Sequence, residues 1–339
     1  MKALPEGLDV GLLLPTLAQG WGLHPIDIQY APLGFGSYHW SVTDVDAARY
    51  FATVDDLDHK PWLGDTRASA FAGLGTAMGT AHALRSQSGL DFVVAPLPRA
   101  DGDCVLRLGD RHALTLFPFV EGQSGRFGHS GHSGHSGHSG QSLGPNAQSR
   151  LVDVLAQLHR VAPVAGARVD VPLAGRRHLE SALAEVDDPW GGGPYSEAAR
   201  EWASGQARQL QRQLERFDEL AETQRDRRLV VTHGEPHPGN VILVEDQVVL
   251  VDWDTVALAP PERDLWLVGD AGGAQLAEYA DATGAAIDER ALAMYRLAWD
   301  LADVAAYLQQ FRSAHQDTAD TAQAWVHLSE LTLDGRPPG

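Results

Sequence analysis

The sequence predicts an α+β protein in two parts, a small sheet-rich part followed by a larger, mainly helical one. Residues 28–57 have the composition of strands around a turn, with a hairpin at Asp44–Ala48. A helix with apolar residues at helical spacing is expected to begin with Asn146 as its N-cap. Residues 196–225 and 289–312 are expected to form two further helices, the first of them mostly polar.

The chain is long enough for two domains. With 339 residues it exceeds what one hydrophobic core usually serves. We expect the first domain at 1–119, with a helix rich in Ala and Gly at 67–87 and short strands at 92–98 and 112–122. The second domain, 120–339, is expected to be helical except for one pair of strands.

A repeated Gly-His-Ser segment occupies residues 128–142. It contains no apolar residue, so it cannot contribute to a core, and we expect a flexible loop. Its four histidines are potential ligands for a transition metal. Gly and Ser spacers do not hold such ligands in a defined geometry, which favours a linker without a specific site.

Composition limits the classes of partner. The formal net charge of −19 argues against binding to nucleic acid and suits a cationic small molecule, although solubility alone also accounts for it. No apolar run approaches the roughly 18 residues of a membrane span, and the first residues do not resemble a signal peptide. A single cysteine, Cys104, excludes an intrachain disulfide, so we expect a cytoplasmic protein. Nothing indicates the oligomeric state.

Residues 228–254 contain the pair of strands and most of the candidate chemistry. The apolar runs 241–244 and 248–251 predict a hairpin, and a centre near Asp246 would place Asn240 opposite Asp252. Amide and carboxylate oxygens at one end of a hairpin suit Mg²⁺, which completes its coordination with water and phosphate oxygens.

Glu235 precedes this hairpin in a loop stiffened by Pro236 and Pro238. A carboxylate beside a metal-bound phosphate can accept the proton of an attacking hydroxyl group. The acid, the amide five residues later and the second acid after two strands together favour phosphoryl transfer.

These segments resemble the aminoglycoside phosphotransferase family. The family's catalytic loop, His-Gly-Asp-x-x-x-x-Asn, is similar to HGEPHPGN here, and its metal-binding segment is similar to LVDWDTVALAPPERDLW. The resemblance implies a bilobal, protein-kinase-like fold, with Glu235 as the catalytic base and Asn240 and Asp252 as Mg²⁺ ligands. It also implies an auxiliary catalytic role for Asp254.

The same resemblance assigns residues around these positions. His233 and Asp264 would be structural, with Asp264 holding the catalytic loop in place. LTLFPFVEG resembles the hinge between lobes, so Phe117, Phe119 and Val120 would contact the base of ATP, or of GTP as the alternative donor. The late helical region is most similar to the spectinomycin-kinase-like branch of the family.

The phosphates would be covered by a glycine turn. Gly34 and Gly36 allow backbone N–H groups to approach an anion, and Ser37 follows them. Glycine pairs of this kind also occur in ordinary hairpin turns, so both interpretations stay open.

Three departures from the family pattern bear on activity. Glu235 replaces an aspartate, Thr53 stands where a phosphate-binding lysine is expected, and residues 67–87 contain no acid to pair with such a lysine. Lys60, Arg49 and His39 are the candidates for the missing positive charge, and the sequence does not choose among them.

Two functions therefore stay open. The first is a Mg²⁺- and nucleotide-dependent O-phosphotransferase for a small, hydroxylated, cationic molecule such as an aminoglycoside or aminocyclitol. Asp300, an acid on an otherwise apolar helix, is the candidate for binding a substrate ammonium group, with an internal salt bridge as the alternative. The second function is that of a degenerate kinase-like protein that binds nucleotide or ligand without transferring phosphate.

Overall fold

The computed structural model describes residues 1–5, 7–34, 36–125, 143–268 and 273–331. The Gly-His-Ser segment, which we predicted to be a flexible loop, lies outside the described residues. The chain forms two compact units. The first unit contains Met1–Arg126, Leu143–Asp170 and Val230–Ala259, and the second contains Val171–Leu229 and the chain from Pro260 onward.

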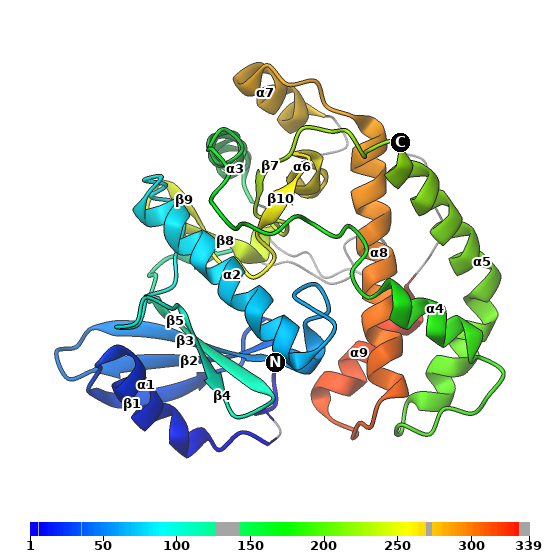
Figure 1. Cartoon of the computed structure of the whole chain (residues 1–339), viewed down its shortest axis with the longest axis horizontal. Coiled ribbons are helices and arrows are strands. Elements are labelled where there is room, and N and C mark those ends of the chain that lie inside the picture. Colours follow the sequence, from blue (N-terminus) through cyan, green and yellow to red (C-terminus); the bar gives the residue numbers. More distant parts are fainter. Residues whose placement is uncertain (6, 35, 126–142, 269–272, 332–339) are drawn as a thin grey trace. The chain divides into compact units, whose positions relative to one another are not determined.

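A five-stranded antiparallel sheet dominates the first unit, in the order β1-β2-β3-β5-β4 (Figure 1). The elements of this region are α1 (Leu13–Trp21), β1 (Pro25–Ala31), β2 (Ser37–Asp44), β3 (Arg49–Asp56), α2 (Arg67–Ser86), β4 (Val105–Leu108) and β5 (His112–Pro118). The predicted hairpin is confirmed, because β2 and β3 pair across the turn with Thr43 opposite Arg49. The predicted helix at 67–87 is also confirmed and begins at a capping box formed by Thr66 and Ser69.

The two faces of this sheet differ because side chains alternate along each strand. One face is apolar: Trp40, Val42, Ala52 and Val54 are buried in a cluster that includes residues of α1. The opposite face of β2 and β3 carries polar residues. Ser37 lies opposite Asp55, and His39 lies opposite Thr53. Ser37 and Asp55 thus form a buried polar pair at one end of the sheet.

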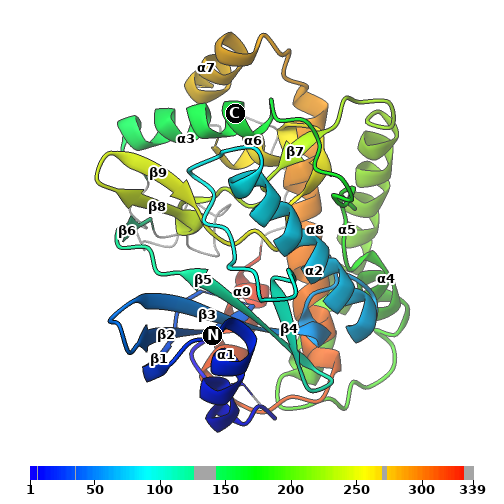
Figure 2. The same ribbon diagram turned by 60° about the vertical axis from the view of Figure 1, so that its left-hand side comes forward.

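A second group of strands follows in the first unit. Strands β6 (Gln123–Ser124), β8 (Val241–Val244) and β9 (Gln247–Leu250) form one sheet, and β7 (Val230–Thr232) pairs with β10 (Ala257–Ala259). Helix α3 (Pro145–Leu158) contacts β9, as Figure 2 shows. This arrangement places the Glu235 loop between β7 and the hairpin β8–β9.

The predicted register of the β8–β9 hairpin is wrong by one residue. Val241 pairs with Leu250 and Val244 with Gln247, so the turn consists of two residues, with Glu245 at φ 53°. Asn240 consequently lies opposite Val251, whose N–H donates to the Asn240 carbonyl over 3.0 Å. The predicted register requires a turn centred on Asp246, whereas the strands are joined by a tight turn of two residues, Glu245 and Asp246.

Two further local predictions are corrected. Helix α3 has Gly144 as its N-cap with Pro145 at its first position, so Asn146 lies inside the helix. Proline suits that position because its missing N–H has no partner in the first turn. Residues 92–98 form no strand; Val93 makes only an isolated bridge to Leu250.

The second unit is helical. Its helices are α4 (Arg176–Ala184), α5 (Ser196–Glu222), α6 (Glu262–Val268), α7 (Ala274–Thr283), α8 (Glu289–Arg312) and α9 (Ala319–Glu330). Helix α8 has the predicted bounds and contacts α4, α5 and α6 (Figure 1). None of the helices in the described ranges is both long and apolar enough to cross a membrane. The predicted α+β class is confirmed.

Candidate active site

The loop between β7 and β8 is held by a buried histidine. The His233 ring donates from Nε2 to the Val251 carbonyl over 2.9 Å, and its Nδ1 accepts the Glu235 N–H over 3.2 Å. These two bonds specify the neutral tautomer with the proton on Nε2. The ring also packs on Trp253, with ring centroids 4.5 Å apart. Gly234 has φ 101°, a conformation that favours glycine, and the chain reverses there to present Glu235.

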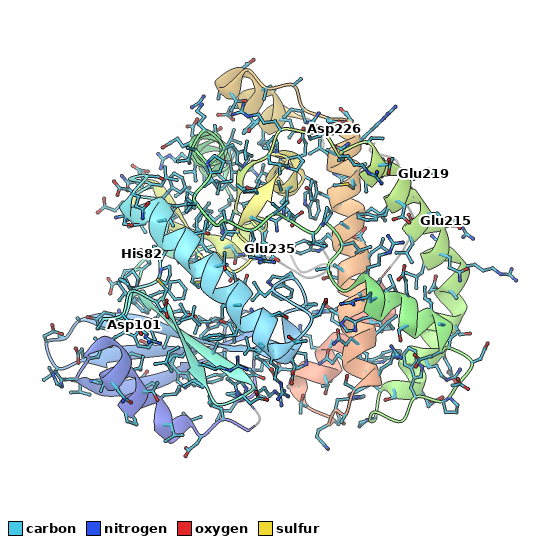
Figure 3. The ribbon with its side chains drawn as sticks, in the orientation of Figure 1. His82, Asp101, Glu215, Glu219, Asp226 and Glu235 are labelled. Atoms are coloured by element: carbon cyan, nitrogen blue, oxygen red, sulfur yellow. The ribbon has the colours of Figure 1, made fainter. Side chains whose placement is uncertain are left out.

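Asn240 closes the other end of the loop. Its Nδ2 donates to the carbonyl of Glu235 over 3.0 Å. The His237 side chain caps the short helical turn Pro238–Asn240 by accepting the Gly239 N–H. Both backbone groups of Glu235 are thus hydrogen-bonded within the loop, and its side chain, labelled in Figure 3, lies 3.9 Å from His237 Nε2.

Asp252 follows β9 with φ 64°, a left-handed conformation that is rare for a residue with a side chain. Local backbone strain of this kind concentrates at functional sites. The residue is exposed to solvent, but protein atoms crowd its carboxyl group. This desolvation, followed by the charges of Asp254 and Glu235, raises the pKa of Asp252 well above its usual value, and Lys60 offsets the effect only in part. The structure therefore brings Glu235, Asp252 and Asp254 into one electrostatic environment.

Lys60 lies at the centre of this group. Its ammonium group is 2.7 Å from Asp254 Oδ2, 2.8 Å from Asp55 Oδ1 and 2.9 Å from Ser37 Oγ, and it lies 5.1 Å from the centroid of the Trp62 ring. Only 3% of the lysine is exposed. Burial by itself lowers the pKa of Lys60, but the carboxylates of Asp254 and Asp55 raise it above the usual lysine value. The lysine is therefore a buried, permanently charged cation.

The donor set fits Mg²⁺. The Asn240 amide nitrogen is hydrogen-bonded to the loop, so its oxygen is the candidate metal ligand. Desolvation, Asp254 and Glu235 raise the pKa of Asp252, and a divalent cation beside the carboxyl group would act in the opposite direction. No three His, Cys, Asp or Glu residues gather as a metal cluster in the described part of the chain. Mg²⁺ needs none, because phosphate and water oxygens complete its coordination.

The glycine turn adjoins the same lysine. Gly34 and Gly36 have φ 65° and 83°, so both positions favour glycine. Ser37 begins β2 directly afterwards, is buried, and donates from Oγ to Asp55 Oδ1 over 2.7 Å. Ser37, which follows the glycine turn, is therefore hydrogen-bonded to both Lys60 and Asp55.

The predicted hinge residues follow β5. Phe117 lies in β5 opposite Phe51, and the Phe119 N–H donates to the Arg49 carbonyl over 3.2 Å. The Arg49 guanidinium also stacks 3.6 Å from the centroid of the Phe119 ring. Contact of Phe117, Phe119 and Val120 with a nucleotide base stays a prediction.

Three predicted or related acids lie in the second unit. Asp264 is fully buried in α6, and its predicted link to the catalytic loop stays a prediction. Asp300 and Asp303 are one turn apart on α8. Burial raises the pKa of Asp300 to about 6, and burial together with the charge of Asp300 raises that of Asp303 to about 7. Asp300 is the predicted substrate-binding residue, and Asp303 forms an acidic pair with it.

Asp303→Asn should stabilise the protein at pH 8 and have little effect at pH 4. The folded protein binds the Asp303 proton more tightly than the unfolded chain, so stability is lost as the pH rises from 3.8 to about 7. Removing the ionisation should recover about 2–4 kcal/mol of unfolding free energy at pH 8. Denaturant unfolding at both pH values measures this, with the exposed Asp281→Asn in α7 as control. Equal stabilisation at both pH values would contradict the assignment.

Comparison with known proteins assigns the chain to a family of enzymes. Residues 32–296 match the model of the phosphotransferase enzyme family, and the chain belongs to that family. Protein StrN of Streptomyces griseus is 30% identical over 267 residues, which cover 75% of each protein. The family resemblance predicted from the motifs is thus confirmed.

Solved structures show the same fold. Spectinomycin phosphotransferase APH(9)-Ia, in complex with ADP and spectinomycin, matches with a TM-score of 0.70 at 18% identity, covering 98% of this chain and 97% of that one. Macrolide 2'-phosphotransferase type I matches with a TM-score of 0.55 at 18% identity, covering 97% and 99%. The kinase-like fold expected from the motifs is therefore confirmed.

Proposed function

We propose that this protein is a Mg²⁺-dependent O-phosphotransferase that transfers the γ-phosphoryl group of ATP or GTP to a hydroxyl group of a small cationic molecule. One observation carries the proposal: the Glu235 loop is fixed at both ends, since His233 Nδ1 accepts the Glu235 N–H over 3.2 Å and Asn240 Nδ2 donates to the Glu235 carbonyl over 3.0 Å. A base position, two oxygen ligands and a constrained loop are the parts that phosphoryl transfer uses.

In the proposed reaction the γ-phosphoryl group moves from the nucleotide to the substrate. The substrate hydroxyl oxygen forms a bond to the γ-phosphorus, the bond from that phosphorus to the β–γ bridging oxygen breaks, and the nucleoside diphosphate leaves. Glu235 accepts the hydroxyl proton. Asn240 and Asp252 would hold Mg²⁺, which would neutralise charge at the phosphate oxygens. Asp254 supports this site from the adjacent turn, through its ion pair with Lys60.

The charge of the protein supports a cationic acceptor. The chain carries a formal net charge of −19, and α8 presents the acidic pair Asp300 and Asp303. An ammonium group beside this pair would lower both carboxyl pKa values, so a cationic acceptor gains binding energy there. Aminocyclitols and aminoglycosides combine ammonium and hydroxyl groups, and spectinomycin is bound by a structurally similar protein. These compounds are the first acceptors to test.

Incubation with Mg·ATP or Mg·GTP and a panel of acceptors tests the proposal. We expect a phosphorylated aminocyclitol or aminoglycoside, detected by mass spectrometry, and no product when Mg²⁺ is chelated. Choline and a neutral macrolide serve as comparison acceptors. Clear nucleotide binding without product from any acceptor would instead favour a binding protein, the alternative suggested by Thr53 and by glutamate at position 235.

A further inference from the structure

Strand β3 lacks the phosphate-binding lysine that the family pattern places at position 53, but another cation of the first unit lies near the same end of the sheet. Position 53 of β3 is threonine, hydrogen-bonded to His39 Nδ1 at 3.2 Å. Burial lowers the pKa of His39 to about 4, so its ring is neutral at pH 7. Arg49 stands at the other end of β3, paired with Glu121 at 2.7 Å. Neither residue brings a free positive charge to the polar end of the sheet.

Lys60 reaches that end of the sheet from the turn after β3. The turn is a short helix, Leu57–His59, and Asp56 caps it by accepting the Asp58 N–H. Arg111 pairs with Asp56 at 2.6 Å and its carbonyl accepts the Leu57 N–H. These contacts hold the backbone before Lys60 in place, so the buried position of its side chain is built into the fold.

The ammonium group of Lys60 joins the two segments between which phosphates would lie. Ser37 directly follows the glycine turn, and Asp254 directly follows the metal-binding segment that contains Asp252. Asp55 and Asp254 contact this ammonium group at 2.8 and 2.7 Å, and the charge of Asp252 also acts on it. Such an excess of negative charge would repel a nucleotide if neither the lysine nor divalent cations were present.

The presence of lysine rather than arginine at position 60 is unusual for this chain. Only two of the 26 lysine and arginine residues are lysines, and the other one is Lys2 near the start of the chain. In a chain that otherwise uses arginine, one lysine is buried among acids. A compact ammonium group is a common phosphate ligand that acts as a point charge, whereas guanidinium is larger and planar.

We propose that Lys60 is the phosphate-binding cation of the nucleotide site, supplied by the turn after β3, with Asp55 as its partner. This inference rests on the proposed function. Without nucleotide, the three N–H donors of Lys60 are directed to Asp254, Asp55 and Ser37. A phosphate oxygen is a charged acceptor like the Asp254 carboxylate, and it takes over that hydrogen bond when nucleotide binds.

The first test compares phosphate-containing and phosphate-free ligands. Lys60→Gln alone would leave buried acids unpaired, so the double variant D55N/K60Q, which keeps the net charge, is compared with D55N. Calorimetry gives the affinities for Mg·ATP and adenosine, or for the guanine pair if GTP is preferred. We expect D55N/K60Q to lower the ratio of triphosphate to nucleoside affinity at least about 10-fold below that of D55N. K2Q should leave the ratio as in the wild type.

The second test uses the unmodified protein, so it does not depend on whether a variant folds. Labelling lysine side chains with ¹³C gives only two side-chain methylene signals next to nitrogen, one from Lys60 and one from Lys2. Saturating Mg·nucleotide should shift the Lys60 signal, whereas the nucleoside should not. The Lys2 signal should stay in place.

The outcomes separate this inference from the proposed function. An unchanged affinity ratio in D55N/K60Q, or a Lys60 signal that does not respond to Mg·nucleotide, overturns the role of Lys60 and leaves phosphoryl transfer intact. If the wild-type protein binds neither Mg·ATP nor Mg·GTP, the proposed function itself fails.

Discussion

Replacing Asp252 with alanine should remove Mg·nucleotide binding and, with it, phosphoryl transfer. Asp252 is the proposed carboxylate ligand, and the neighbouring Asp254 carboxylate is already in an ion pair with Lys60 at 2.7 Å. We expect a loss of Mg·nucleotide affinity of at least about 100-fold, since even outer-shell partners of metal ligands contribute 10- to 100-fold. Calorimetric titration of Mg·ATP and of ATP without metal measures the change.

Folding of the Asp252 variants can be monitored independently. Because desolvation and the neighbouring acids raise the pKa of Asp252, removing its carboxyl group should preserve or increase the melting temperature without metal. Asp252→Asn is the matched control, because asparagine tolerates the left-handed backbone found at φ 64°. Mg·nucleotide should raise the melting temperature of the wild type but not of either variant. A normal increase in Asp252→Ala would exclude the residue as a ligand.

Glu235→Gln should have the opposite profile, with nucleotide binding retained and turnover lost. Glutamine keeps the shape of the side chain, and the backbone bonds to His233 and Asn240 do not depend on the carboxylate. A general base contributes roughly 100- to 10,000-fold, so kcat should fall by that range. Single-turnover measurements with a confirmed acceptor separate this chemical step from product release.

Glu235→Asp tests whether the loop is adapted to glutamate. Both backbone groups of residue 235 are hydrogen-bonded within the loop, so a shorter side chain cannot be compensated easily. We expect kcat to fall by up to about 100-fold, the cost of a displacement on the order of 1 Å. Full turnover in Glu235→Gln would refute the role of base, whichever result the aspartate variant gives.

Much of the local structure follows from short-range patterns in the sequence. The β2–β3 hairpin and helix α8 were predicted closely, since their apolar periodicity and turn residues are local properties. The HGEPHPGN motif likewise identified the family, because its residue types and spacing are unusual. The predicted N-cap of α3, Asn146, and the predicted register of the β8–β9 hairpin were wrong by one or two residues. Alternative caps and turn lengths differ little in energy, so local sequence does not fix such boundaries.

The sequence by itself determined the fold class, the family and the loop that carries Glu235. Only the tertiary structure shows which of the three candidate cations is buried among acids, namely Lys60, with Asp55 as one of its ion-pair partners. Asp254 lies 194 residues from Lys60 in the chain, and their 2.7 Å contact exists only after the sheet and the β8–β9 hairpin assemble. Local patterns describe neighbours in sequence, whereas a buried charge is stabilised by whichever groups the completed fold brings around it.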